Sequence, residues 1–205
     1  MKNKYSVTLA PVTLGDCEII SQWTSSETWV YASGIRAYMS PTDVQAFLNR
    51  VDDEFLLACT DDGQAIGVVS WKQDDTPGNY TVGSMIGDAD MWGAGFGLES
   101  VILLVGMLFD SRNAHRVGFT CGVFNKRAVE NFCSGIMKVE GVLRDYYFLD
   151  GQYYDALMGS ILRDDYYAVR EPSYIIPPAE KVAAQLVLDE FIRRNPMLPH
   201  SKPGE

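Results

Sequence analysis

The sequence predicts a mixed α/β fold, in which helices flank one sheet, and three observations lead to this class. Short β-branched and apolar segments bounded by turn residues recur up to Ile86. A glycine-rich loop and a long apolar helix come next, and a strand, a short helix and a hairpin complete the pattern. Strands and helices in this order are typical of domains that pack helices against a sheet. The 205 residues suffice for one such domain with an appendage.

The first forty residues carry strand and helix signals. Tyr5–Leu9 is strand-like, and Leu14–Trp23 has apolar residues at helical spacing. Pro41–Val51 is expected to be a second helix, because Ser40 is a good N-cap and proline suits the first helical position. Helical periodicity is lost between residues 24 and 40, so we expect no regular element there.

A hairpin and one further strand are expected before the glycine loop. Phe55–Thr60 and Ala65–Trp71 flank an Asp62-Gly63 turn, which is a strong hairpin signal. Tyr80–Ile86 is the next strand.

Beyond the loop, the apolar run that ends at Phe109 is expected to be helical. A strand over Arg116–Val123 and a short helix over Asn125–Ser134 come next. A last hairpin pairs residues 145–149 with Gln152–Leu162.

The loop between Ile86 and the apolar helix is rich in glycine. A glycine loop at a helix N-terminus leaves main-chain N–H groups unpaired, and the helix dipole adds attraction for a phosphate. Gly95 and Gly97 would let a bulky anion approach the main chain, since neither has a Cβ atom. The spacing fits neither the dinucleotide fingerprint nor the phosphate loop of nucleotide hydrolases. The glycines alone therefore leave two interpretations open, an anion-binding loop and a plain tight turn.

Three ordered motifs narrow this choice. Trp92–Ser100 reads W-G-A-G-F-G-L-E-S, Asn125 is followed by K-V-E-G-V-L-R at Lys138–Arg144, and Tyr154–Tyr166 closes the series. Over roughly residues 5–168 the chain resembles the GNAT acyl-CoA N-acyltransferases, in particular their RimJ/RimL-like branch. The resemblance implies a GNAT-type, mostly antiparallel twisted sheet with a splayed strand pair and flanking helices.

The resemblance also implies a cosubstrate, acetyl-CoA, and no metal. The loop would hold the pyrophosphate, and a main-chain N–H near Met85 or Ile86 would polarise the thioester carbonyl. Asn125 would contact the pantetheine arm or the active-site backbone, although an N-cap role fits it equally well. The residues implied on the cosubstrate side are Met85, Ile86, Trp92, Gly93, Ala94, Gly95, Phe96, Gly97, Leu98 and Asn125.

The implied activity is N-acetyl transfer to a primary amine of a small metabolite, a peptide or a protein N-terminus. The amine would attack acetyl-CoA directly in a ternary complex. An alternative from another class is a GNAT-fold sensor or partner protein that binds an acyl-CoA with little catalysis.

The groups that handle protons depart from the family pattern. Thr81, Ala128 and Phe132 stand where relatives often carry Glu, Ser and a Tyr acid. The remaining catalytic candidates are Glu99, Cys133 and Asp155. Glu99 could instead interact with the helix dipole, and Cys133 could be an inert apolar residue.

Composition excludes several classes. A net charge of −10 argues against a nucleic-acid surface, and it suits either a cationic amine substrate or solubility alone. Four scattered cysteines and two histidines give no zinc or disulfide pattern. No apolar run reaches the length of a membrane span, and the N-terminus lacks a signal-peptide core, so a cytoplasmic location is expected.

We expect two parts, with an acyltransferase domain over residues 1–168. Residues 169–205 would form a Pro-rich linker, an amphipathic helix over Ala179–Arg194 and a flexible tail. The helix carries the apolar residues Val182, Ala183, Leu186, Val187 and Phe191 on one side. This stripe would be buried against the domain or against a second subunit in a homodimer.

Overall fold

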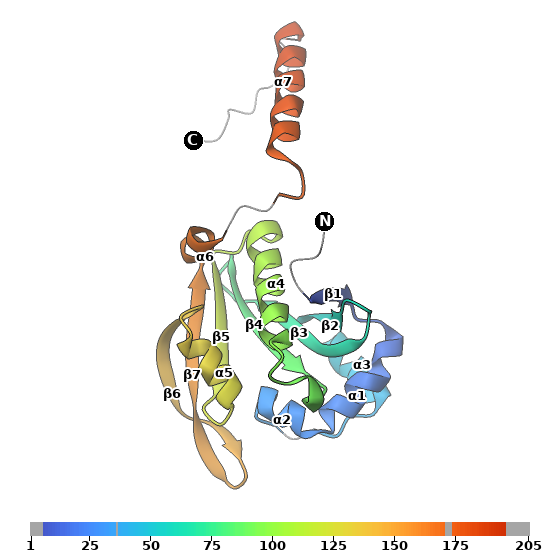
Figure 1. Cartoon of the computed structure of the whole chain (residues 1–205), viewed down its shortest axis with the longest axis vertical. Coiled ribbons are helices and arrows are strands. Elements are labelled where there is room, and N and C mark those ends of the chain that lie inside the picture. Colours follow the sequence, from blue (N-terminus) through green and yellow to red (C-terminus); the bar gives the residue numbers. More distant parts are fainter. Residues whose placement is uncertain (1–5, 36, 171–173, 196–205) are drawn as a thin grey trace. The chain divides into compact units, whose positions relative to one another are not determined.

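A computed structural model describes residues 6–35, 37–170 and 174–195 of the chain (Figure 1). Contacts between Cα atoms divide the chain between Tyr166 and Tyr167 into two compact units, and each is described by itself.

The first unit contains one sheet and most of the helices. Its strands are β1 (Val7–Pro11), β2 (Glu54–Thr60), β3 (Ala65–Gln73), β4 (Asn79–Ile86), β5 (Arg116–Gly122), β6 (Lys138–Leu149) and β7 (Gln152–Leu162). The helices are α1 (Cys17–Thr24), α2 (Glu27–Ser33), α3 (Pro41–Arg50), α4 (Phe96–Ser111) and α5 (Lys126–Cys133), with short 3-10 turns at η1 (Leu14–Asp16) and η2 (Ala89–Met91). Helix α6 (Arg163–Val169) spans the division between the two units.

The seven strands form one mixed sheet in the order β1-β2-β3-β4-β5-β7-β6. All neighbouring strands are antiparallel except β4 and β5, which run parallel. That parallel pair is joined over only three residue pairs, Asn79–Thr81 with Arg116–Gly118. Beyond them the two strands part, and we call the gap between Val82–Ile86 and Phe119–Gly122 the splay. The predicted mixed, mostly antiparallel sheet with a splayed pair is confirmed.

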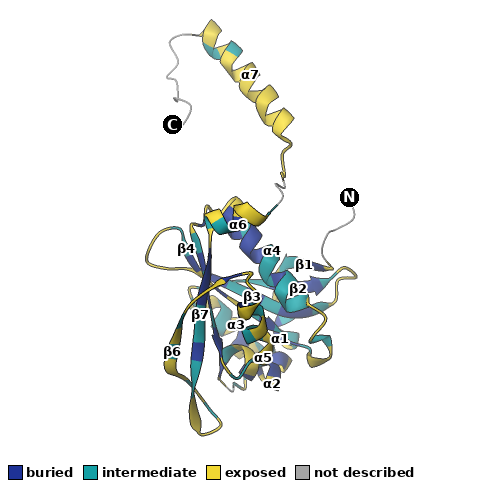
Figure 2. Cartoon of the chain, turned by 60° about the vertical axis from the view of Figure 1, so that its left-hand side comes forward, coloured by how far each residue is buried: buried dark blue, intermediate teal, exposed yellow. Residues whose placement is uncertain are grey.

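Hydrophobic clusters cover both faces of the sheet. Helix α4 packs on one face, where Leu104, Leu108 and Phe109 are almost completely buried (Figure 2). Helices α1 and α3 contribute to a second cluster. Because side chains alternate along a strand, Val82 of β4 belongs to the first cluster and Met85 to the second. The end of β4 is therefore held from both sides.

Local signals predicted most elements correctly. Strands β2 and β3 form the expected hairpin, and Gly63 in its turn has a φ of 85°. Helix α3 begins with the expected cap, because the hydroxyl of Ser40 accepts a hydrogen bond from the N–H of Asp43 and the Asp43 carboxylate accepts one from the N–H of Ser40.

The expectation of no regular element between residues 24 and 40 was wrong, since α2 lies there. This helix has only seven residues, and its side chains divide between the buried core and the cavity. Thr28 and Val30 are buried, whereas Tyr31 is exposed. A helix without a continuous apolar stripe gives no periodic signal.

In the second unit, α7 (Pro178–Arg194) confirms the predicted helix. Its predicted stripe, including Val182, Leu186 and Phe191, is exposed (Figure 2). Burial of that stripe stays a prediction. The predicted flexible tail (196–205) and part of the linker (171–173) lie outside the described residues. Across the described ranges, no helix has both the length and the apolar character that a bilayer span requires.

A polar cluster ties β5, β6 and β7 together at the closed end of the splay. Two N–H groups of Arg116 donate to the two carboxylate oxygens of Glu140 at 2.6 and 2.5 Å, and the buried Ser160 hydroxyl donates at 2.7 Å. These bonds favour the ionised form, and Arg116 is the main cause that lowers the pKa of Glu140 from 4.5 to about 2.

A carboxyl with a depressed pKa stabilises the fold above its ordinary pKa and loses this contribution as the pH falls towards the folded value. We therefore predict that Glu140→Gln lowers the melting temperature near neutral pH. The difference from wild type should shrink between pH 4.5 and about pH 2. Asp52→Asn, at an exposed ion pair with Lys72, is the control and should change little at any pH. A constant difference across this pH range would contradict the assignment.

Candidate active site

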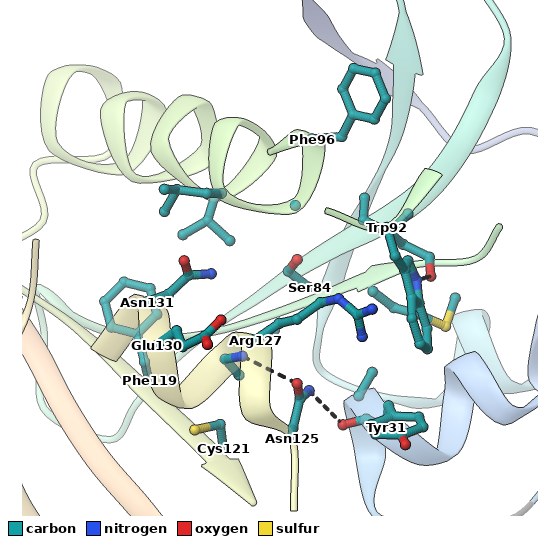
Figure 3. Close-up of a pocket in the computed structure, with 18 of the residues that line it drawn as sticks. Tyr31, Ser84, Trp92, Phe96, Phe119, Cys121, Asn125, Arg127, Glu130 and Asn131 are labelled. Atoms are coloured by element: carbon teal, nitrogen blue, oxygen red, sulfur yellow. Dashed lines mark hydrogen bonds between the residues drawn. The ribbon is translucent and has the colours of Figure 1, made fainter. Parts of the chain in front are cut away.

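A cavity of about 410 Å³ lies at the splay (Figure 3). Its walls are the last residues of β4, the loop and first turn of α4 over residues 91–98, the middle of β5, one side of α5 and three residues of α2. A separated pair of parallel strands exposes main-chain groups that would otherwise pair with each other. The cavity therefore brings together main-chain donors and side chains that lie far apart in the sequence.

The main-chain N–H of Ile86, at the end of β4, faces the splay. The N–H of Gly87 donates to the carbonyl of Ile66 on the β3 side. Peptide groups alternate along a strand, so those of Ile86 face the other way, towards the splay. Consistent with this, the carbonyl of Ile86 accepts a hydrogen bond from the indole of Trp92 at 3.0 Å. By the same alternation, the peptide groups of Met85 face β3, and its side chain is buried.

The glycine loop has the conformation of an anion cradle. Gly93 and Gly95 have φ values of 86° and 89°, which side chains other than glycine's rarely adopt, and both face open space. A Cβ atom at Gly97 would instead lie 3.3 Å from the side chain of Ile86. The first intrahelical bond runs from the Glu99 N–H to the Gly95 carbonyl. The N–H groups before it have no helical partner and are available to a phosphate.

Arg127 adds a positive charge that sequence reasoning missed. Its guanidinium carbon lies 4.6 Å from the centre of the Trp92 ring, and Figure 3 shows it reaching towards that ring across the cavity. In the described part of the chain no carboxylate forms a salt bridge with it, whereas the neighbouring Lys126 is bound to Glu130. The signal in the sequence is a basic residue two positions after Asn125, on the helical face that meets the loop.

Asn125 joins α5 to α2. Its side-chain oxygen accepts from the N–H of Ala128 at 3.1 Å, which is the N-cap bond that the sequence predicted. Its side-chain nitrogen donates to the carbonyl of Tyr31 at 2.9 Å (Figure 3). The amide thus fixes the entry of α5 and the position of Tyr31 together. A contact between Asn125 and the cosubstrate stays a prediction.

The structure gathers the predicted cosubstrate residues but separates the predicted catalytic ones from them. The cavity lining includes every predicted cosubstrate residue except Ala94. Glu99, Cys133 and Asp155 are described residues outside that lining. The carboxylate of Glu99 accepts two bonds from Ser6, and that of Asp155 accepts the N–H of Asp145.

Cys133 is exposed at the end of α5. Catalytic roles for Glu99, Cys133 and Asp155 stay predictions; the structure gives Glu99 and Asp155 other partners and places all three outside the cavity lining.

A thiol that the sequence analysis did not single out for catalysis, Cys121, does line the cavity. Burial is the main cause that raises the pKa of Cys121 from 9.0 to about 11, and Cys133 adds to it. The thiol is therefore protonated near neutral pH and is a poor nucleophile. Thr81 lies outside the lining, and its hydroxyl donates to Asp74 at 2.9 Å.

A mixed sheet with a splayed strand pair, a helix N-terminus and an arginine side chain that line one cavity suit a protein that binds a phosphate-bearing ligand. Residues 6–130 match the family model described as an acetyltransferase (GNAT) domain. The chain is 25% identical over 170 residues to an uncharacterized N-acetyltransferase p20 of Bacillus licheniformis, covering 78% of this chain and 94% of that protein.

Solved structures show the same fold. Spermidine N-acetyltransferase from Vibrio cholerae, in complex with CoA and spermine, aligns with a TM-score of 0.72 at 19% identity over 79% of this chain and 98% of the other. A GNAT-family acetyltransferase from Bacillus anthracis aligns with a TM-score of 0.68 at 14% identity over 79% and 98%. The chain belongs to the GNAT acetyltransferase family. It is an N-acetyltransferase that uses acetyl-CoA as its acetyl donor.

The cradle can be tested with two glycines that share a backbone conformation. Gly95 and Gly63 both have positive φ and open space, but only Gly95 lies in the loop. An added Cβ atom strains either position by roughly 1–2 kcal/mol. We predict that Gly95→Ala and Gly63→Ala lower the free energy of unfolding by similar amounts, while only Gly95→Ala weakens CoA binding measured by calorimetry. Equal CoA affinity in both folded variants would remove the loop from the site.

Proposed function

We propose that the enzyme transfers the acetyl group of acetyl-CoA to a primary amine by direct attack in a ternary complex. The observation that carries the proposal is that Ile86 turns its carbonyl, and by strand alternation its N–H, away from β3, in the wall of the same cavity as the glycine cradle. Phosphate anchoring and carbonyl polarisation are the two requirements of acyl transfer from CoA that a main chain can satisfy.

The cradle and Arg127 fit the anionic part of the donor. The loop offers N–H groups at the start of α4, and the guanidinium of Arg127 lies across the cavity without a carboxylate partner among the described residues. A guanidinium binds phosphate through several N–H groups at once. Arg127 would therefore compensate the negative charge that the donor brings to a protein of net charge −10.

The N–H of Ile86 would polarise the thioester carbonyl. A tetrahedral intermediate places negative charge on that oxygen, and a fixed N–H donor stabilises the charge without reorganising. The attacking amine forms the new C–N bond, the C–S bond breaks, the thiolate takes up a proton, and the amine gives up one. The protein contributes position and polarisation, which can supply a large part of the barrier reduction.

Direct attack is favoured over a covalent acyl-enzyme. Cys121 is the thiol in the cavity lining, and its raised pKa of about 11 keeps it protonated near neutral pH. A protonated thiol does not compete with a neutral amine for the thioester.

We assign the acyltransferase function to residues 1–168 and treat residues 169–205 as an appendage. The cavity lining runs from Thr28 to Met137, and contacts divide the chain just after Tyr166.

Within the family, the loop at Trp92–Ser100 and the run at Lys138–Arg144 support the RimJ/RimL-like branch. The acceptor class remains a primary amine of a small metabolite, a peptide or a protein N-terminus. A cationic acceptor is supported by the net charge of the chain and by the spermidine N-acetyltransferases that share its fold.

The function is tested by following thiol release from acetyl-CoA with a panel of amines, and by identifying acetylated products by mass spectrometry. The panel should include a polyamine, a small aromatic amine and peptides with free N-termini. Binding of CoA without turnover of any amine would contradict the proposed enzyme activity and favour a protein that binds acyl-CoA as a sensor.

For the donor site, we predict that Arg127→Gln weakens CoA binding by about tenfold or more, because a hydrogen bond between charged groups contributes roughly 1.5–3 kcal/mol. The loss should be smaller at high salt, because salt screens the attraction. Lys126→Gln is the matched control, since this neighbouring side chain is 86% exposed and is absent from the lining. Equal losses in both variants would point to a general effect of charge rather than to a site.

For proton transfer, we predict that kcat/KM rises with pH towards the pKa of the acceptor amine. Thr81, Ala128 and Phe132 cannot titrate near neutrality, so the substrate's own deprotonation should govern the rate. Thr81→Val should reduce kcat/KM by less than about tenfold, since its hydroxyl is bound to Asp74 outside the lining.

An acceptor of lower pKa is the control, and it should move the rise to lower pH by the same interval. An acidic limb that stays in place when the acceptor changes would assign the base to the protein. In that case Glu99→Gln, Cys133→Ala and Asp155→Asn identify the group, because the responsible variant flattens the limb.

A further inference from the structure

Three contacts from different elements converge on Trp92. Its indole N–H donates to the carbonyl of Ile86 at 3.0 Å. The ring of Tyr31 meets it edge-on at 5.3 Å between ring centres, and the guanidinium of Arg127 lies over it at 4.6 Å (Figure 3). We propose that Trp92 is a positioning residue for acetyl transfer, because it holds the carbonyl of Ile86, the residue whose N–H would polarise the thioester. This inference rests on the proposed function of that N–H.

The splay creates the need for such a residue. Strand β5 stops pairing with β4 after Gly118, so it no longer supplies hydrogen bonds to the following residues of β4. The peptide groups of Ile86 face this gap and lose both strand partners. An unpaired carbonyl in the wall of a cavity would attract water or turn the strand end. The indole of Trp92 occupies this position and gives the carbonyl its partner.

The chemistry of the indole suits the task, because it donates a hydrogen bond and accepts none. It can therefore pair with the Ile86 carbonyl without competing for the Ile86 N–H. A hydroxyl or an amide side chain at residue 92 would carry an acceptor as well, and this acceptor could capture the N–H that the thioester needs. A donor-only group keeps the catalytic N–H free.

The Trp92 ring is held by contacts with two other elements, α2 and α5. Tyr31 is held by Asn125, which donates to its carbonyl from the N-cap of α5. Arg127 approaches from the same helix one residue beyond its start. The following residue, Gly93, begins the cradle with a φ of 86°. Trp92 thus connects the segment that would anchor phosphate with the residue whose N–H would polarise the thioester.

Loss of the indole N–H should separate these two functions. The cradle would still bind the phosphates, so affinity for CoA should stay within about threefold, which corresponds to less than 1 kcal/mol. The Ile86 carbonyl would lose its partner at the splay, although Gly87 would stay bound to Ile66. Rotation of the backbone at Ile86 would then turn its N–H away from the thioester, so kcat should fall by about tenfold or more, towards the effect of losing a main-chain donor altogether. A role confined to folding would not split binding from turnover in this way.

The experiment compares wild type with Trp92→Phe, which keeps an aromatic ring and removes the N–H. Acetyl-CoA labelled with ¹³C at the thioester carbonyl is bound without acceptor, and its signal is recorded by NMR and by isotope-edited infrared spectroscopy. In wild type the bound carbonyl should be more polarised than in free acetyl-CoA. In Trp92→Phe the signal should move back towards the free value, with CoA affinity retained and kcat reduced.

Trp71→Phe is the matched control. This indole also donates a hydrogen bond, to Glu54 at 3.2 Å, but Trp71 is absent from the cavity lining. It should alter the melting temperature and leave the carbonyl signal and kcat unchanged. Should Trp92→Phe not fold, benzothienylalanine at position 92 replaces the N–H by sulfur and keeps the shape of the indole.

The outcomes test the positioning role of Trp92 and the proposed acetyl transfer separately. An unchanged carbonyl signal and kcat in a folded Trp92 variant would overturn the positioning role. Loss of CoA affinity together with turnover would also overturn it, in favour of an anchoring role. If wild type bound acetyl-CoA but acetylated no amine, the proposed function would fail, and the carbonyl signal measured without acceptor would still decide whether Trp92 orients the peptide.

Discussion

The site depends on a broken strand pairing. β4 and β5 are joined over three residue pairs and then separate, so main-chain groups that a continuous sheet would satisfy face a cavity instead. Such groups destabilise a fold unless each finds a partner. The Arg116–Glu140 pair, with Ser160, holds neighbouring strands together at the closed end, and the indole of Trp92 pairs with a carbonyl at the open end. The stability of the fold and the availability of a reactive N–H are therefore set by the same few bonds.

Opposite charge requirements meet at this cavity. The chain carries a net charge of −10, which favours the approach of a cationic amine but opposes a donor with several phosphate charges. Arg127 and the first turn of α4 both line the cavity, and their positive charge would oppose that repulsion locally. The net charge can thus attract the amine from a distance, while the local positive groups bind the phosphates of the donor. Salt screens the interaction of exposed charges beyond about 10 Å and weakens contacts between buried groups less.

The sequence predicted what is encoded locally. The Asp62-Gly63 turn, the cap at Ser40 and the N-cap at Asn125 each depend on a few consecutive residues, and the structure confirms all three. Helix α2 and Arg127 escaped prediction for the opposite reason. The inward residues of α2 divide between core and cavity, so they give no periodic pattern. Arg127 becomes part of the cavity only through the packing of α5 near a loop some thirty residues earlier in the chain, and this contact is not visible in the sequence. The contact between Trp92 and Ile86 likewise depends on the direction of a main-chain carbonyl, and the residue types do not determine that direction.

A main-chain donor also explains why the usual proton-handling positions can vary. In the proposed mechanism the donor is the N–H of Ile86, which does not titrate, so its polarising effect would be independent of pH and of the side chain of any residue other than proline at position 86. Such a mechanism would depend on the orientation of the Ile86 backbone more than on a particular acid or base, and Trp92 is bound to that backbone through the Ile86 carbonyl. Substitution to Thr81, Ala128 and Phe132 leaves that orientation intact, because these residues are not the partners of the Ile86 peptide. The rate would then depend on the acceptor amine, because only its neutral form attacks the thioester carbonyl and the pH sets the fraction that is neutral.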